Sequence, residues 1–371
     1  MRILAVNAGS SSLKASIVEG RRFVSTTVNW DRAGRSATLA RALSEIHVSA
    51  HDVDAVAHRV VHGGERLTEP VVIDDAILEE IAAVGELAPL HNEVALETVA
   101  AARAAIPDRP HIACFDTAFH AGLPEVATRY PVPDKWRTTW GIRRFGFHGL
   151  SVEWAVDRAA ELLGRAADDL QLVIAHLGSG CSVTAVSGRR SIWTSMGFTP
   201  LDGLMMRTRS GAIDPGILFH VVRRGGLRVE DVEQALEHAS GLVAVGGHNG
   251  DVRQLGAAAA DGDPDARLAL DMFALHAAAG IAGAATSLPR LDAIVFTGGI
   301  GEHASTVRAQ IVARLGVVGA PAIPALETGQ DRILASGPVA VLRVEAHEDL
   351  VMARAAVRLQ RDKVITAGGG A

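Results

Sequence analysis

Two segments of the chain place an arginine beside glycines, a combination suited to binding phosphate or carboxylate oxygens. Arg59 lies in the run His58-Arg59-Val60-Val61-His62-Gly63-Gly64, and Arg209 lies in Thr208-Arg209-Ser210-Gly211. A planar guanidinium matches two oxygens at once, and the transition state of phosphoryl transfer spreads charge over three oxygens. We therefore interpret Arg59 and Arg209 as a candidate clamp on an acceptor and a phosphoryl group. For Arg59, a surface ion pair is the open alternative.

Asp116 and His148 could act on the group that is transferred. Asp116 follows an apolar run and precedes Thr117, so it could cap a helix or orient metal-bound water or a reacting group. A carboxylate acceptor is already ionised at pH 7, so Asp116 would organise rather than accept a proton. His148, between Phe147 and Gly149, could donate a hydrogen bond to a phosphoryl oxygen or serve as a structural histidine between domains.

Two further segments could bind phosphate or a metal ion. In Asn7-Ala8-Gly9-Ser10-Ser11-Ser12-Leu13-Lys14, a tight turn at Gly9 could surround phosphate oxygens with N–H groups and hydroxyls. Lys14 adds charge, and Asn7 could ligate a hard cation. An ordinary hairpin loop with a solvated lysine is the alternative. Glu348, after the last apolar run, could ligate a metal or be a first-turn helix acid.

Three glycine-rich segments are candidate nucleotide contacts. Two follow apolar runs that predict strands, and the third is a loop. Because Thr297–Glu302 opens a predicted helix, its N–H groups and the helix dipole favour anions. The candidate residues are His176, Leu177, Gly178, Ser179, Gly180, Asp251, Val252, Arg253, Gly299, Ile300, Gly301 and Glu302.

Alternating strands and helices must position these segments, which predicts an α/β fold. Period-two and apolar runs predict strands at 3–7, 13–19, 55–61, 112–115, 172–177, 182–186, 293–297 and 339–344. Helical periodicity predicts helices at 77–87, 92–106, 152–163, 229–239, 265–287, 304–315 and 348–363.

The chain also repeats a pattern, which indicates duplication. Residues 2–19 and 172–186 each read as a strand, a Gly/Ser turn and a second strand. We therefore expect two related domains that face a shared cleft. The boundary is expected near Gly149, with an N-terminal domain at 1–149, completed by a helix at 349–371, and a nucleotide-binding domain at 150–348.

Composition narrows the class of protein. The chain has 371 residues, which favours two domains. Its net charge of -6 offers no broad basic surface, so we expect neither nucleic acid nor a membrane as partner. Cys114 and Cys181 stand alone in apolar runs and are expected to be buried thiols. The apolar run at 268–288 contains Asp271 and His276, so we expect a buried helix and a cytoplasmic protein.

Taken in order, these motifs resemble the acetate kinase family. The matching segments are NAGSSSLK from Asn7, HRVVHGGE from His58, FDTAFH from Phe115, GIRRFGFHG from Gly141, HLGSG from His176, TSMGFTPLDG from Thr194, TRSG from Thr208, TGGIGE from Thr297 and EDL from Glu348. The resemblance spans residues 7–350. It implies the duplicated domains of sugar kinases, actin and heat-shock chaperones, which have a ribonuclease H-like fold. It also implies ATP, Mg²⁺ (for which Mn²⁺ could substitute) and a homodimer.

The resemblance also implies roles for individual residues. Asn7 and Glu348 match metal-site positions, and Arg59 matches a substrate-binding arginine. Asp116 matches the catalytic acid, and His148 and Arg209 match positions that stabilise the transition state. The residues expected to bind ATP are Lys14, His176–Gly180, Asp251–Arg253 and Gly299–His303.

Several positions depart from the family pattern. Ser179 replaces the usual Asn of HLGNG, Ala212 follows TRSG in place of Asp, and Leu150 replaces the Thr of GFHGTSH. Val152 replaces the His of that motif, and His347 and Asp349 replace an Asn and a Glu beside Glu348. The loop before Asp251 is Gly-rich rather than Ser-rich. We expect these changes to affect nucleotide affinity and acyl-chain preference. None of them replaces a residue assigned to phosphoryl transfer.

The resulting prediction is reversible, ATP-dependent phosphorylation of acetate to acetyl phosphate and ADP by direct in-line transfer. Propionate or butyrate kinase activity is the alternative within the same chemistry, because a methylene changes pocket affinity by only about 1–3 kcal/mol. A nucleotide-binding switch of the actin and chaperone type is the alternative from another class.

Overall fold

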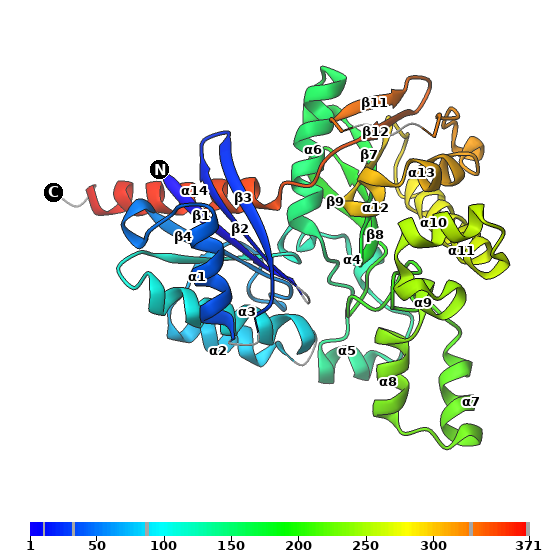
Figure 1. Cartoon of the computed structure of the whole chain (residues 1–371), viewed down its shortest axis with the longest axis horizontal. Coiled ribbons are helices and arrows are strands. Elements are labelled where there is room, and N and C mark those ends of the chain that lie inside the picture. Colours follow the sequence, from blue (N-terminus) through cyan, green and yellow to red (C-terminus); the bar gives the residue numbers. More distant parts are fainter. Residues whose placement is uncertain (10–11, 32–33, 86–88, 326–328, 369–371) are drawn as a thin grey trace. The chain divides into compact units, whose positions relative to one another are not determined.

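The structure is a computed structural model that describes residues 1–9, 12–31, 34–85, 89–325 and 329–368. Ser10 and Ser11 of the first predicted phosphate loop lie outside the described residues. The chain divides into two compact units (Figure 1). The first consists of Met1–Ala121, Phe147–Trp154 and His347–Ala371, and the second of Gly122–Gly146 and Ala155–Ala346.

The segment Gly122–Gly146 belongs to the second unit, whereas the sequence placed the domain boundary near Gly149. Backbone hydrogen bonds account for this difference. The N–H groups of Phe145 and Gly146 both donate to the carbonyl of Gly197, at 3.0 Å and 3.5 Å. The segment is therefore fastened to the second unit before the chain returns to the first.

A six-stranded sheet in the order β3-β2-β1-β4-β6-β5 forms the centre of the first unit. Strands β1, β4 and β6 are parallel, whereas β2, β3 and β5 are antiparallel to their neighbours. The strands are β1 (Arg2–Ala8), β2 (Ser12–Glu19), β3 (Arg22–Asn29), β4 (Ala55–Val60), β5 (Val71–Val72) and β6 (His111–Phe115).

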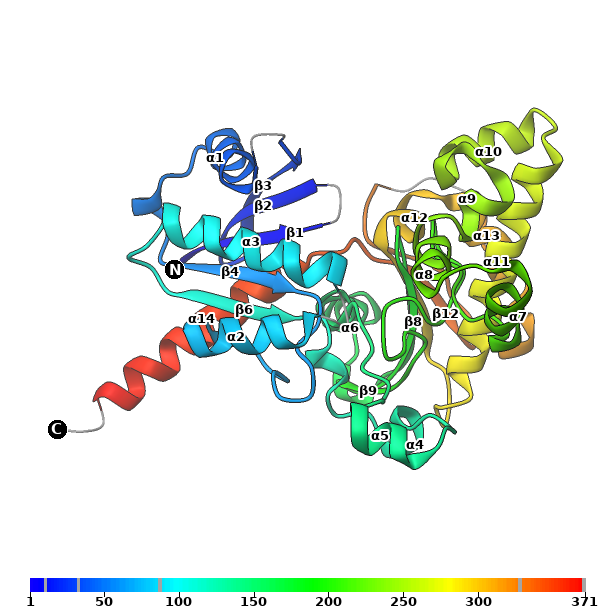
Figure 2. The same cartoon turned by 90° about the horizontal axis from the view of Figure 1, so that it is seen from below.

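Helices cover both faces of this sheet, as Figure 2 shows for α1 and α3 on one side and α14 on the other. Successive β1 residues point to opposite faces, so Leu4 packs toward α1 and α3 while Ile3 packs toward α14. The helices are α1 (Arg35–Glu45), α2 (Asp75–Ala83), α3 (Pro89–Ala105) and α14 (Glu348–Gly368). The C-terminal helix therefore completes the N-terminal unit.

The second unit repeats the arrangement with the order β11-β12-β10-β7-β8-β9. Strands β7, β10 and β12 are parallel, and β8, β9 and β11 are antiparallel to their neighbours. The strands are β7 (Gln171–Leu177), β8 (Cys181–Ser187), β9 (Arg190–Thr194), β10 (Ala293–Thr297), β11 (Arg332–Ala335) and β12 (Ala340–Arg343). The matching strand orders confirm the predicted α/β class and the predicted duplication.

Helices of the second unit are α4 (Glu125–Thr128), α5 (Asp134–Trp140), α6 (Gly149–Leu163, whose first turns belong to the first unit), α7 (Pro215–Gly225), α8 (Val229–His238), α9 (Gly241–Gly246), α10 (Val252–Ala260), α11 (Pro264–Ala285), α12 (Gly298–His303) and α13 (Ser305–Val312). Among the described residues, α11 alone is long and apolar enough to cross a membrane by length and composition. It packs against β7 and β8 and buries residues such as Phe273 and Ile281, as a core helix does.

Candidate active site

The carboxyl ends of the three parallel strands in the first unit bring three predicted residues together. Asn7 lies near the end of β1, Arg59 near the end of β4, and Asp116 directly after β6. The parallel register sets Arg59 opposite Cys114 and Val60 opposite Phe115. Ligand sites of open α/β sheets form at this edge.

An ion pair between Arg59 and Asp116 is the centre of this group. Nε of Arg59 donates to Oδ1 of Asp116 at 2.9 Å, and Nη2 donates to Oδ2 at 2.5 Å. The side chains are only 16% and 1% exposed, so the pair is a bidentate one held away from bulk water. The alternative of a surface ion pair for Arg59 does not fit this burial.

Asn7 and Glu348 extend the group. Nη1 of Arg59 donates to Oδ1 of Asn7 at 3.1 Å, and Nδ2 of Asn7 donates to Oε2 of Glu348 at 2.7 Å. Nε of Arg59 lies 3.7 Å from Oε2 of Glu348. Burial opposes the charge of Arg59, but the carboxylates of Asp116 and Glu348 outweigh it and raise its pKa above the ordinary value. Burial raises the pKa of Glu348 despite the opposing charge of Arg59.

Lys14 lies on the neighbouring strand β2 and pairs with Asp349, the residue after Glu348. Nζ of Lys14 is 3.1 Å from Oδ2 of Asp349, and the hydroxyl of Ser16 donates to the same oxygen at 2.7 Å. Burial opposes ionisation of Asp349, but its hydrogen bond with His347 and the charge of Lys14 lower its pKa below the ordinary range. Asp349 is thus a buried anion that holds the start of α14 against β2.

His148 adopts a left-handed backbone conformation with φ of 60°, which is uncommon for a residue other than glycine. The chain is tightly packed just after it. The N–H of Gly149 donates to the carbonyl of Asp116 at 2.8 Å, and a Cβ at Gly149 would lie 2.3 Å from that oxygen. Only glycine fits there, so the backbones of Asp116 and His148 are coupled through Gly149.

A cavity of about 360 Å³ lies in the second unit, and this volume falls within the usual range of small-molecule sites. Three loops form it: the β7–β8 turn, the start of α10 and the turn into α12. Eight of the predicted nucleotide residues line it: Gly178, Ser179, Asp251, Val252, Arg253, Gly299, Ile300 and His303. Hydrogen bonds from Arg253 hold the pKa of Asp251 at about 2, so this loop carries a fixed carboxylate.

The other predicted nucleotide residues of this unit do not line the cavity. Leu177 is fully buried, and Gly301 faces Phe296. Oε1 of Glu302 accepts a hydrogen bond from the N–H of Ala346 at 3.0 Å, which is a structural contact. Gly180 closes the β7–β8 turn by accepting from the N–H of Gly178, and His176 stands against Gly298.

Sequence reasoning missed Arg207, which also lines this cavity. Its Nε donates to the carbonyl of Asn249 at 2.8 Å, and its backbone N–H donates to the carbonyl of Ser179 at 3.3 Å. Asn249 and His248 both have positive φ, 51° and 49°, so Arg207 braces a strained loop. Its position two residues before Arg209 was the signal that could have identified it.

Arg209 lies elsewhere in the second unit, close to the β7–β8 turn. Its Nη1 donates to the carbonyl of Pro200 at 2.7 Å, and its charge acts on the buried thiol of Cys181. Burial lowers the pKa of Arg209. Within the part of the chain that the structure describes, Arg209 forms no ion pair. A partly buried guanidinium with no ion-pair partner among the described residues is well placed to receive an anion.

The metal prediction depends on Asn7 and Glu348. The described residues contain no group of three or more His, Cys, Asp or Glu side chains that could hold a metal ion. Oxygen atoms of Asn7 and Glu348 nevertheless suit Mg²⁺, which commonly takes one or two carboxylates and completes its shell with phosphate oxygens and water. The donor set therefore fits a cation that takes most of its ligands from a bound substrate and water.

Comparisons with known proteins agree on one family. Residues 27–354 match the model of the acetokinase family. An acetate kinase of Deinococcus radiodurans is 42% identical, over 95% of this chain and 97% of its own length. The crystal structure of a propionate kinase from Francisella tularensis superposes with a TM-score of 0.87 at 33% identity, covering 95% of this chain and 98% of its own. The acetate kinase of Porphyromonas gingivalis superposes with a TM-score of 0.85 at 29% identity, with the same coverage.

The match extends over nearly the full length of the chain, and its motifs lie where the geometry gathers buried charge and glycine-rich loops. These findings confirm the resemblance predicted from the ordered motifs. The chain belongs to the acetokinase family.

Proposed function

We propose that this chain transfers the γ-phosphoryl group of ATP to acetate, giving acetyl phosphate and ADP in a reversible reaction. The observation that carries the proposal is the buried Arg59 at the carboxyl ends of the parallel strands. Membership of the acetokinase family and the names of its relatives as acetate kinases agree with this activity.

Arg59 keeps donors available for an acceptor carboxylate. A guanidinium carries five N–H donors, and the three contacts to Asp116 and Asn7 use one donor each from Nε, Nη1 and Nη2. One N–H on each terminal nitrogen is left for a second carboxylate. Asp116 thus fixes the orientation of the guanidinium, and we assign it the role of organiser rather than base.

Arg209 and His148 are the proposed stabilisers of the transferred phosphoryl group. Arg209 supplies a positive charge that pairs with no carboxylate of the described chain, and His148 supplies a ring whose backbone is held by the Gly149 contact. The acceptor oxygen attacks the γ-phosphorus in line with the departing ADP, and both side chains meet the charge on the equatorial oxygens.

The loops around the 360 Å³ cavity are the proposed nucleotide site. Lys14 has a narrower role than the sequence implied, because its ammonium is paired with Asp349 and is 33% exposed. It could meet a phosphate only while sharing its charge with that carboxylate. Asn7 and Glu348 would hold Mg²⁺, and this ion would supply positive charge that neutralises the phosphates of ATP.

A hydroxamate assay tests the activity directly, because hydroxylamine traps acyl phosphates. We expect acetohydroxamate from ATP, Mg²⁺ and acetate, and none when either ATP or acetate is left out. A nucleotide-binding switch would close on ATP and give no hydroxamate. Comparison of kcat/KM for acetate, propionate and butyrate then decides the preferred acid, since one of the similar structures is a propionate kinase.

We further propose a homodimer in the cytoplasm. Helices α7 and α8, which the structure describes throughout, carry no buried residue, yet they and their flanks expose apolar side chains that a second copy could cover; these are Ile213, Ile217, Phe219, Val222, Leu227 and Val229. Light scattering is expected to give twice the mass of the chain, and Phe219→Asp to give monomers. A monomer before substitution would refute the dimer.

The proposed cytoplasmic location agrees with the two cysteines. Cys114 and Cys181 are free and buried, as expected in a reducing compartment.

A further inference from the structure

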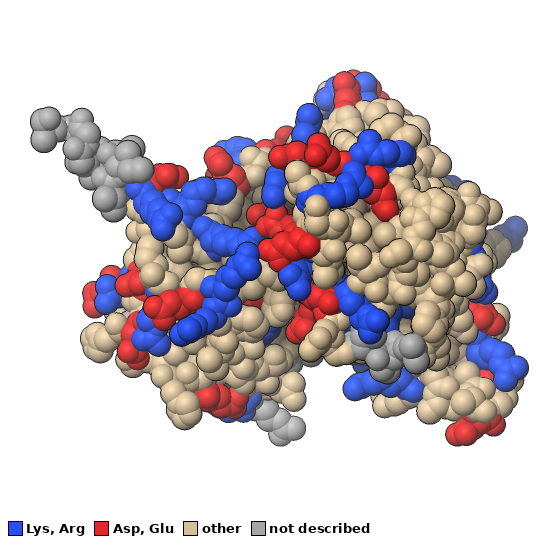
Figure 3. Space-filling model, turned by 90° about the horizontal axis from the view of Figure 1, so that it is seen from above, with Lys and Arg blue, Asp and Glu red and all other residues tan. Residues whose placement is uncertain are grey.

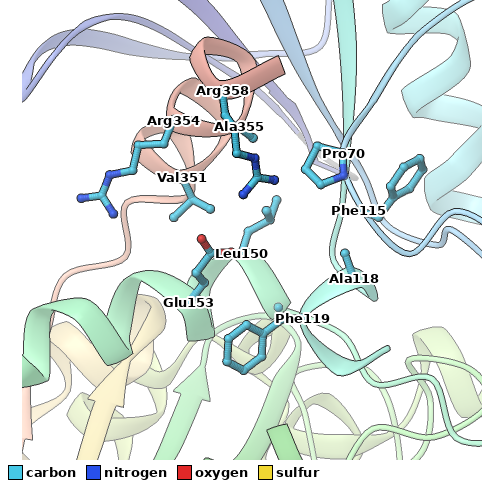
Figure 4. A pocket seen from close by; sticks show the side chains of 11 residues that line it. Pro70, Phe115, Ala118, Phe119, Leu150, Glu153, Val351, Arg354, Ala355 and Arg358 are labelled. Carbon is cyan, nitrogen blue, oxygen red and sulfur yellow. The ribbon is translucent and has the colours of Figure 1, made fainter. Parts of the chain in front are cut away.

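A second cavity lies in the first unit, on the side of the sheet that α14 covers. Its volume is about 280 Å³, and Figure 4 shows it between α14, the start of α6 and the turn that follows β6. Its apolar wall is formed by Phe115, Phe119, Leu150, Val351 and Ala355. Neither the acceptor site nor the nucleotide loops include these residues. We call it the α14 cavity.

The charged residues of the α14 cavity are Arg354, Arg358 and Glu153. Figure 4 shows the guanidinium of Arg358 directed into the cavity between Pro70 and Val351, whereas that of Arg354 is directed away from it. Arg354 stands over the ring of Trp154 at 5.3 Å. Within the described residues, Arg358 makes no hydrogen bond or ion pair. Basic side chains interspersed with acidic ones also gather on the left of the face in Figure 3.

The residues that line the α14 cavity indicate which class of ligand would fit it. Arg358 is the positive charge directed into the cavity, and Glu153 would repel a second negative charge on a ligand. The apolar wall favours a hydrophobic body. A carboxylate would match the fork of Arg358, because two oxygens accept from two N–H groups. A monocarboxylate with an aromatic or branched body therefore fits better than inorganic phosphate or a diacid.

The wall of the α14 cavity is continuous with the proposed catalytic segment. Phe115 directly precedes Asp116, and Gly149 directly follows His148. The hydrogen bond from the Gly149 N–H to the Asp116 carbonyl joins the two. A ligand that fixes this wall would act on the backbone that holds both groups.

The cavity also borders the places where the chain passes between its two units. These crossings follow Ala121, Gly146, Trp154 and Ala346. Phe119, Glu153 and Val351 each lie within about five residues of a crossing. Such segments absorb the backbone changes when units of a kinase move during turnover. A ligand packed among them would restrict that motion.

We propose that the α14 cavity binds a small monocarboxylate with an apolar body, and that its occupancy lowers kcat without competing with acetate. The carboxylate pairs with Arg358, and the body packs against Phe119, Leu150 and Val351. The kinetic part of this inference rests on the proposed acetate kinase activity, whereas the binding part does not.

Binding is tested with 3-phenylpropionate as the probe and the neutral 3-phenylpropanamide as its control, in a ligand-observed NMR titration of the full chain. We expect a Kd on the order of 1 mM for the acid and none measurable for the amide. Arg358→Gln should weaken binding about tenfold or more, since it removes a charge-assisted pair, and Arg358→Lys should weaken it less. Arg361→Gln is the matched control, because Arg361 lies on the same helix but does not line the α14 cavity.

Saturating acetate should not displace the probe, and displacement would instead place the probe at Arg59 and overturn the site. Equal binding by the Arg358→Gln and unsubstituted chains would also overturn it. In the hydroxamate assay, saturating probe should lower kcat about fivefold, the lower end of typical coupling between sites, with KM for acetate unchanged. An unchanged kcat would overturn the inhibitory role, and a chain that binds the probe but makes no hydroxamate would contradict the proposed function alone.

Discussion

A pair of buried histidines makes the first unit sensitive to acid. Nε2 of His58 lies 2.9 Å from Nδ1 of His111, and Nε2 of His111 lies 3.0 Å from the carbonyl of Ile106. A carbonyl can only accept, so His111 carries its proton on Nε2 and accepts at Nδ1 from His58. Protonating His111 at Nδ1 would set two N–H groups against each other. The neutral rings are therefore required by the fold.

The size of the effect follows from the pKa of His58. Burial, followed by the charge of His111, lowers this pKa from 6.5 to about 3. The unfolded chain therefore takes up the proton first as the pH falls. The contribution of neutral His58 to the free energy of unfolding is fully present above pH 6.5. It is lost progressively between about pH 6.5 and 3. At pH 5 the loss is about 1.5 pH units at 1.36 kcal/mol each, or roughly 2 kcal/mol from His58.

The test compares urea unfolding, followed by circular dichroism, at about pH 7 and pH 5. His58→Gln keeps an N–H donor for His111 but cannot titrate. Its free energy of unfolding should fall by about 2 kcal/mol less than that of the unsubstituted chain over this range. His238→Gln, at a half-exposed position, controls for loss of one imidazole. If the His58→Gln chain lost as much stability as the unsubstituted one, the buried pair would not be the acid-sensitive element.

Three further predictions concern the proposed reaction. Arg209→Ala should lower kcat by about 10²–10³, the usual loss for one transition-state donor, while ATP binding measured by calorimetry persists; an unchanged kcat removes Arg209 from the mechanism. Arg59→Lys keeps the charge beside Asp116 but loses the fork, so KM for acetate should rise about tenfold, and an unaltered KM would refute the acceptor role. Arg207→Ala should raise KM for ATP by roughly tenfold with kcat nearly constant, because it frees the strained loop at Asn249; a fall confined to kcat would contradict this.

The duplicated fold could be predicted from the sequence because both halves carry long apolar strands and a Gly/Ser turn. The strand β3 and the helix α1 were not predicted, since six of the eight β3 residues are exposed and α1 is mainly polar on its outer face. Helix α7 was missed although its signals were present. Asp214 caps it, Pro215 begins it and Gly226 ends it in a left-handed conformation.

Individual site residues could also be predicted from the sequence, but their arrangement in space could not. Arg59, Asp116 and Glu348 are separated by long stretches of chain, and only the parallel register and the packing of α14 bring them together. The rule that sites form at carboxyl ends of parallel strands would have grouped Asn7, Arg59 and Asp116. It could not have grouped Glu348, which enters from a helix 232 residues after Asp116.

The charges of this group link the proposed acceptor site to the proposed metal site. Arg59 contributes one positive charge against the carboxylates of Asp116 and Glu348, and the Lys14–Asp349 pair adds no net charge. With Glu348 ionised, the group is therefore net negative at the proposed acceptor site. Burying such an excess costs stability, and apolar residues would pack there at lower cost. An acceptor carboxylate would deepen this imbalance unless a cation bound as well, so we expect acetate binding at the proposed site to depend on Mg²⁺.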